Sequence, residues 1–116
     1  MINEFRRARR RKVSDNILVT DTMTDSVVGR ISNLSETGML LITSVPMVED
    51  ALYQFRFHLH DARGGERAFE VGAHLLWTDH ASAPGQAWTG LRFISVPPEQ
   101  AEQLRHWIDA PGGHFE

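Results

Sequence analysis

This chain contains short apolar runs that turn residues separate, and in two of them apolar side chains recur at every second position. Residues 53–59 alternate strictly, so that Tyr53, Phe55, Phe57 and Leu59 fall on one side. A period of two is typical of a β-strand that buries one of its faces. Several short runs of this kind, spread along the chain, predict an all-β domain.

The turn residues divide the chain into six predicted strands. The polar segment 21–25 and the sequence DARGG at 61–65 are typical of hairpin turns. The expected strands cover residues 17–20, 27–31, 39–42, 53–59, 68–77 and 87–94. In the fifth strand, alternation predicts one shared face for Phe69, Val71, Ala73, Leu75 and Trp77.

The last part of the chain changes to a helical period. Pro97, Pro98 and Glu99 suit the first turn of a helix, because proline needs no N–H partner there and an acid favours the positive end. One helical face then holds Ala101, Leu104, Trp107 and Ile108. The sequence therefore predicts a six-stranded antiparallel β-barrel with a C-terminal α-helix, since closure removes exposed strand edges.

Composition limits the classes of protein that this chain can belong to. Its 116 residues, 41% of them hydrophobic, suffice for one core. The absence of Cys excludes disulfides and thiolate metal sites, and fits a cytoplasmic location. No apolar run approaches the roughly 20 residues of a membrane span, so we expect no membrane insertion. The basic N-terminus leads into no apolar segment of a secretory signal.

Charge is distributed unevenly along the chain. Residues 1–12 contain five Arg, one Lys and one Glu, a net charge of +5. The whole chain has a net charge of −3, which leaves −8 for residues 13–116. A basic arm on an acidic body favours a small anionic ligand over a long polyanion, which the body would repel. We expect a flexible, Arg-rich ligand-binding arm at 1–12, the barrel and helix at 13–110, and a tail at 111–116.

The basic arm contains Arg-x-x-x-Arg in two registers. One register pairs Arg6 with Arg10, and the other pairs Arg7 with Arg11. A guanidinium is planar, bonds phosphate through two N–H groups, and matches the O6/N7 edge of guanine. Five arginines against one lysine therefore indicate that planar guanidinium groups bind a phosphate or a base edge. Basic tails that are merely solvated are, however, common.

A second polar motif lies between the second and third predicted strands. Asn33 and Ser35 are two residues apart, which places them on one side of an extended chain. Their amide and hydroxyl groups offer donors and acceptors for a base edge. Gly38 permits a positive φ or a close backbone approach. Taken alone, the motif is an ordinary polar turn.

Together the two motifs resemble the signature of the PilZ domain family, R-x-x-x-R followed by [D/N]-x-S-x-x-G. The order of strands, the late Trp77, the Gly90-Leu91-Arg92-Phe93 strand and the closing helix are also similar to that family. The resemblance implies a barrel that binds cyclic di-GMP. It implies that Arg7 and Arg11 grip guanine edges and phosphates and that Arg6 adds a stacking or phosphate contact. It also implies that Asn33 and Ser35 contact a guanine and that Gly38 keeps the turn open.

This resemblance implies a receptor without catalytic activity or a cofactor. The run contains more arginines than the family signature requires, so Arg10 can take the place of Arg11 in binding. We expect the ligand to order the arm and thereby signal to a protein partner. The family's usual outputs are motility, surface attachment, exopolysaccharide and virulence. The sequence does not decide whether one ligand or an intercalated pair binds.

Other functions fit the residues less well. His58 and His60 alternate with Leu59, but no further ligand completes a metal site. The segment 79–82 has residue types of a hydrolase triad but no nucleophile elbow, so we expect no enzyme. Two alternatives remain: a PilZ-fold adaptor that binds no nucleotide, as in type IV pilus systems, and a small DNA- or RNA-binding barrel.

Overall fold

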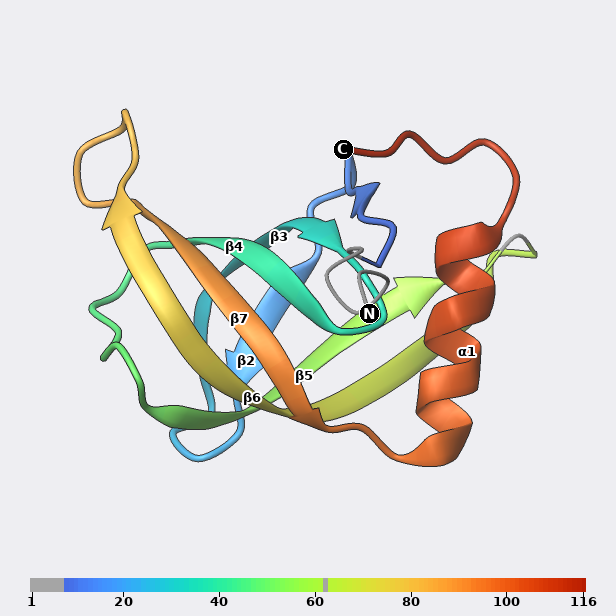
Figure 1. Cartoon of the computed structure of the whole chain (residues 1–116), viewed down its shortest axis with the longest axis horizontal. Helices are drawn as coiled ribbons and strands as arrows, with labels where there is room; N and C mark the ends of the chain where they lie inside the picture. The colour runs from blue at the N-terminus through green and yellow to red at the C-terminus, as the bar shows by residue number, and fades with distance from the viewer. Residues whose placement is uncertain (1–7, 62) are drawn as a thin grey trace, which may run out of the picture.

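Six antiparallel strands close on themselves in the computed structural model, which describes residues 8–61 and 63–116. The ring runs β3-β2-β5-β6-β7-β4, and pairing of β3 with β4 closes it (Figure 1). One further short strand, β1, lies outside the ring against β3. The strands are β1 (Arg11–Lys12), β2 (Leu18–Asp21), β3 (Ser26–Leu34), β4 (Gly38–Thr43), β5 (Leu52–His60), β6 (Glu66–His80) and β7 (Ala87–Ser95). The predicted barrel of six strands is thus confirmed.

The alternation in the sequence becomes an inside and an outside of the barrel. On β5, Phe55, Phe57 and Leu59 are buried while the residues between them are exposed or half-buried. The rings of Phe57 and Phe69 stack inside the barrel with their centroids 5.5 Å apart. Such aromatic contacts bury large apolar areas, which is the main stabilising contribution in a domain of this size.

Strand pairing begins within the segment expected to be an arm, at its described residues Arg11 and Lys12. Arg11 is opposite Leu34 and Lys12 is opposite Asn33, so β1 extends the sheet beyond β3. The C-terminal tail also lies along this strand, because the Lys12 N–H donates to the His114 carbonyl at 2.7 Å. A strand of two residues is too short to show a hydrophobic period in the sequence. It forms because β3 and the C-terminal tail pair with it on its two sides.

Trp77 is the one of the five residues predicted to share a face of β6 that lies outside the barrel. Phe69, Val71, Ala73 and Leu75 are buried as expected, but Trp77 is 44% exposed. The pairing of β6 with β7 shifts between Leu75 and Trp77. An extra residue in one strand turns the following side chains to the other face. The prediction that Trp77 shares the face of Leu75 is therefore wrong.

Helix α1 (Pro98–Asp109) packs beside the barrel through the face that the sequence predicts. Leu104 and Ile108 are buried, and Trp107 is half-buried against the core. No helix among the described residues has the length and apolar character that crossing a bilayer requires.

The carboxyl end of α1 is capped by Arg11 from the arm. Its Nη1 donates to the carbonyl oxygens of Trp107 at 2.7 Å and Ala110 at 2.9 Å. The guanidinium also lies over the Trp107 ring, with Cζ 4.8 Å from the ring centroid. A cation is favoured here because the last carbonyls of a helix have no partner within the helix and form its negative end.

We expect the loss in free energy of unfolding on truncating a leucine of β5 to depend on how deeply that leucine is buried. Leu59 is 2% exposed and Leu52 is 64% exposed, although both belong to the same strand. Leu59→Ala should lower the free energy of unfolding by about 2–5 kcal/mol, because it leaves a cavity in the core. Leu52→Ala should change it by less than about 0.5 kcal/mol. Urea unfolding followed by circular dichroism measures both values, and equal losses would contradict the assigned inner face.

We also expect the arm to contribute to stability through Arg11. Arg11→Ala should cost about 1.5–3 kcal/mol, the range for partly buried hydrogen bonds from a charged group. Arg9→Ala is the matched control, since its ion pair with Asp109 is exposed and is worth less than about 1 kcal/mol. Thermal and urea unfolding of both variants test the cap. A larger loss for Arg9→Ala would show that the cap is misassigned.

Candidate ligand-binding site

The two sequence motifs meet on the outer surface of β3. The Arg10 Nη1 donates a hydrogen bond of 2.9 Å to the Oδ1 of Asn33. Asn33 pairs with Leu40 on the outward-facing side of the sheet, yet it is only 2% exposed. An outward residue with this little exposure is covered from outside, and the Arg10 guanidinium lies on it. The described end of the arm and the polar turn are therefore in contact.

A row of residues runs from Asn33 across the outside of the barrel. Asn33 is opposite Leu40 on β4, Leu40 is opposite Gly90 on β7, and Gly90 is opposite Trp77 on β6. Residues opposite one another in antiparallel strands place their side chains on the same face. The Trp77 indole lies directly on Gly90, where a Cβ would collide with it. The row thus begins with Asn33 and ends with a half-exposed tryptophan.

The side chain of Ser35 forms hydrogen bonds within its own turn. It is fully buried, and its Oγ accepts hydrogen bonds of 3.2 Å from the backbone N–H groups of Thr37 and Gly38. The Ser35 N–H also donates to the Gly38 carbonyl at 2.9 Å. A serine that bonds backbone groups two and three residues on is a turn-forming serine. Its side chain shapes the loop that follows Asn33.

Gly38 is required by a close approach between strands. A Cβ at this position would collide with the Leu91 carbonyl oxygen on β7. Of the two roles that the sequence left open for Gly38, the structure shows the close approach, because the positive-φ glycines lie elsewhere in the described chain. The polar turn is therefore held against β7 as well as β3.

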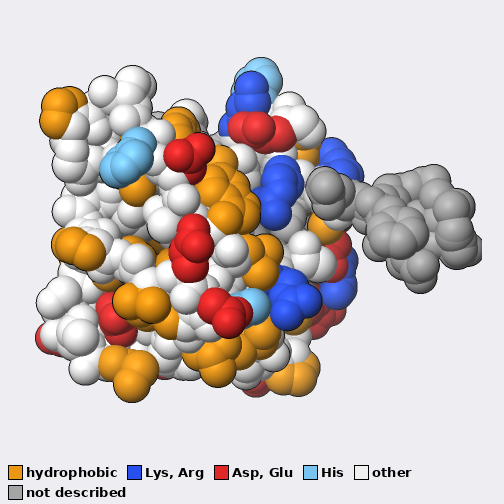
Figure 2. Space-filling view, turned by 60° about the vertical axis from the view of Figure 1, so that its left-hand side comes forward, with side chains coloured by type: hydrophobic (Ala, Val, Ile, Leu, Met, Phe, Trp, Pro, Cys, Tyr) orange, Lys and Arg blue, Asp and Glu red, His pale blue; other side chains and the backbone are white. Residues whose placement is uncertain are grey.

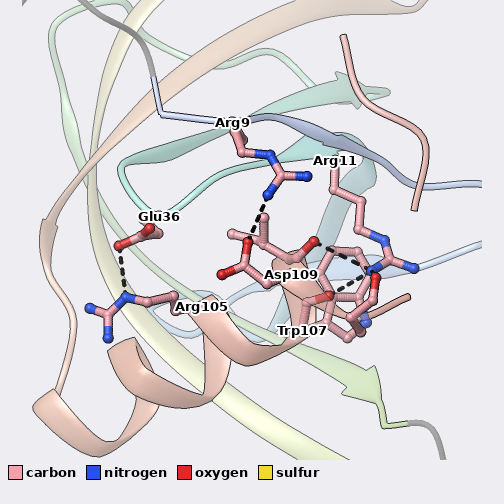
Figure 3. A network of polar contacts seen from close by, with 8 residues as sticks. Arg9, Arg11, Glu36, Arg105, Trp107 and Asp109 are labelled. Carbon is pink, nitrogen blue, oxygen red and sulfur yellow. Dashed lines mark hydrogen bonds and ion pairs between the residues drawn. The ribbon is translucent and has the colours of Figure 1, made fainter. Parts of the chain in front are cut away.

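Helix α1 contacts both halves of the site (Figure 3). Arg9 pairs with Asp109 at 3.2 Å, and Arg105 pairs with Glu36 of the polar turn at 3.2 Å. Each of these pairs is about half exposed, so each contributes little stability alone. With the Arg11 cap, however, they connect the helix to the arm on one side and to the turn on the other.

The predicted site residues are only partly brought together. Arg10 and Asn33 are in contact, with Ser35 and Gly38 in the adjoining turn. Arg11 lies against α1 instead of facing Asn33. Arg6 and Arg7 lie outside the described residues.

Sequence reasoning missed that Trp77 lies on the outer surface, at the end of the row that begins with Asn33. Simple alternation places it in the core, and a bulge has no reliable mark in a single sequence. Gly90 was the available signal, because a strand glycine often marks the close approach of another group.

A separate cavity of about 700 Å³ lies between β1, the β5–β6 hairpin and α1. Of the predicted site residues described by the structure, Arg11 alone lines it. Asp61 lies at the rim of this cavity. Its carboxylate accepts hydrogen bonds from the backbone N–H groups of Gly65 and Arg63 in the same turn. These bonds hold the pKa of Asp61 below its ordinary value. The described residues contain no group of three metal-ligating side chains.

Comparisons with known proteins agree with this architecture. A family model described as PilZ domain matches residues 4–110. The search of curated proteins finds no match. PilZ domains are receptor and adaptor domains, and no catalytic family is indicated.

The solved structures that share the fold include two named proteins. One is the inhibitor of motility MotI/DgrA of Bacillus subtilis, with a TM-score of 0.72 and 12% identity over 88% of this chain. The chain spans 48% of that protein. The other is the PilZ domain of YcgR from Escherichia coli with c-di-GMP, with a TM-score of 0.62 and 19% identity over 86% of each chain. The family match covers nearly the whole sequence, and the chain therefore belongs to the PilZ domain family.

Proposed function

We propose that this chain is a receptor for cyclic di-GMP that passes the signal to a protein partner. The observation that carries the proposal is the hydrogen bond between Arg10 and Asn33, which joins the two halves of the family signature in one place. The YcgR PilZ domain, which shares the fold, was solved with c-di-GMP. The ligand's two guanines and two phosphates match an arginine-rich arm beside an amide.

In this proposal the ligand replaces the contact between Arg10 and Asn33. The guanidinium that now covers Asn33 turns to a phosphate or to the O6/N7 edge of a guanine. The Asn33 amide is then open to the same nucleotide. Ser35 and Gly38 position Asn33 by holding the turn against β7. Their part in binding is thus through the shape of the turn.

The row that ends at Trp77 provides a surface for a base. Gly90 has no side chain, so the indole packs directly against it, and the half-buried Leu40 is the next residue of the row. Trp77 is 44% exposed, which leaves aromatic surface for stacking. Stacking of a base on an aromatic side chain is worth about 1–3 kcal/mol. We infer that one guanine lies between the arm and Trp77.

The arrangement of the arm favours the register of Arg6 with Arg10. Arg10 contacts the polar turn, while Arg11 holds the carboxyl end of α1 with two hydrogen bonds of 2.7 and 2.9 Å. Recruiting Arg11 to the ligand would uncap the helix. Arg7 precedes Arg11 by four residues and belongs to the disfavoured register.

The same arrangement supplies a route for the signal. Arg9 and Arg11, on either side of Arg10, both contact α1. A ligand that reorients Arg10 therefore alters the contacts of the helix, whose outer surface is open to a partner. Because one protein of this fold is an inhibitor of motility, motility is the first output to measure.

We predict that Arg10 and Arg11 differ in their effects on ligand binding. Arg10→Ala should weaken cyclic di-GMP binding by about 10- to 150-fold, because a hydrogen bond to a charged group is lost. Arg11→Ala should bind within about threefold of the unchanged protein, although it is less stable. Isothermal titration calorimetry measures both, with GTP as the control ligand. The opposite ranking would assign the site to Arg7 and Arg11.

We also predict a contribution from the aromatic surface. Trp77→Ala should weaken cyclic di-GMP binding by about 5- to 150-fold through lost stacking. Trp77→Phe should recover most of that loss. Leu76→Ala is the matched control, since Leu76 is an exposed neighbour outside the row. If the unchanged protein gave no heat with cyclic di-GMP, the receptor proposal would fail and a nucleotide-independent adaptor would take its place.

A further inference from the structure

An exposed arginine, Arg92 of β7, lies beside the polar turn and beside the row that begins with Asn33. It is opposite Gly38 on β4, and a Cβ on Gly38 would lie 3.3 Å from the Arg92 Cα. Gly90, a member of the row, is two residues away on the same strand, which is about 7 Å. Because the buried Leu91 separates them, Gly90 and Arg92 share the outer face.

The Arg92 guanidinium has no carboxylate partner among the residues that the structure describes. Two carboxylates of adjoining segments are already paired. Glu36 of the polar turn pairs with Arg105 at 3.2 Å. Asp50 lies 2.6 Å from the Nε2 of His74, which is the β6 residue opposite Arg92. Arg92 is therefore available to an anionic ligand at this place.

The position of Arg92 complements that of Arg10. Arg10 contacts Asn33 on β3, whereas β7 lies two strands further, at roughly 10 Å. A ligand that covers Leu40 and Gly90 has Arg10 on one side and Arg92 on the other. Cyclic di-GMP is a ring with two phosphodiester groups on opposite sides. An arm at the Asn33 end reaches one of them, and the other needs a second cation.

Basic and apolar side chains also border one another on the molecular surface more widely. Figure 2 shows Lys and Arg side chains in the right-hand half of the view, beside hydrophobic side chains that are open to solvent. A surface of this kind suits a nucleotide, since apolar and aromatic groups contact its bases while cations contact its phosphates.

We propose that Arg92 binds the second phosphate of cyclic di-GMP and thereby favours the cyclic dinucleotide over guanine ligands with one phosphate. This inference rests on the proposed receptor function. A guanidinium bonds a phosphate through two N–H groups, which fixes the orientation of the ring as well as its charge. The row with Leu40, Gly90 and Trp77 contacts a base, and Arg10 and Arg92 contact the phosphates on either side of it.

Isothermal titration with two ligands tests the role of Arg92. Cyclic di-GMP and the linear dinucleotide GpG have the same two guanines, but GpG has a single phosphate. Arg92→Ala should weaken cyclic di-GMP binding by about tenfold or more, because a charge-assisted hydrogen bond is lost. It should weaken GpG binding by less than about threefold. Arg92→Lys should recover part of the loss, since it keeps the charge without the planar fork.

Arg63→Ala, at the exposed β5–β6 turn, is the matched control. It removes the same charge at a distance from the row and should leave both dissociation constants unchanged. Circular dichroism should show the same fold for all three variants, because each replaces an exposed side chain.

The outcomes separate this inference from the function on which it rests. If the unchanged protein binds cyclic di-GMP and Arg92→Ala binds it equally well, the role of Arg92 is refuted while the receptor proposal stands. Equal losses for cyclic di-GMP and GpG would place Arg92 at a group that both ligands share, and would overturn the assignment to the second phosphate. If the unchanged protein binds no cyclic di-GMP, both proposals fail.

Discussion

Strand β3 pairs with three other strands, and the fold depends on those pairings. Its bonds to β2 and β4 close the barrel, and its far end holds β1. A shift of register between Ile31 and Asn33 lets Ile31 and Leu34 stay buried while Asn33 turns outward. The strand that completes the core therefore also supplies the amide on which the arm folds.

The arginines of the extended arm contact two different parts of the molecule, the polar turn and helix α1. Successive side chains of an extended chain point to opposite sides, so Arg10 reaches Asn33 while Arg9 and Arg11 reach α1. The Arg11 contacts to carbonyl oxygens are short and part-buried, whereas the Arg9 pair is exposed and weak. Individual side-chain contacts thereby link the helix to the arm and to the turn. This is the basis for expecting a change at Arg10 to reach the helix.

Most of the barrel could be predicted from the sequence because hydrophobic period and turn chemistry are local properties. All six expected strands and the helix are present, with ends that differ by a few residues. Three features depend on distant partners and could not be predicted. Strand β1 exists only through its pairing with β3 and the tail. The bulge before Trp77 arises from pairing with β7. The choice between Arg10 and Arg11 is made by the carbonyl groups at the end of α1.

The central claim, that arm and outer barrel surface form one nucleotide site, is tested most directly by amide and indole NMR signals during titration with cyclic di-GMP. The account predicts saturable shifts at the Asn33 side-chain amide and at the Trp77 indole, with Leu59 and its neighbours inside the barrel unchanged. Shifts confined to residues around the cavity between β1, the β5–β6 hairpin and α1, with Asn33 and Trp77 unmoved, would contradict it.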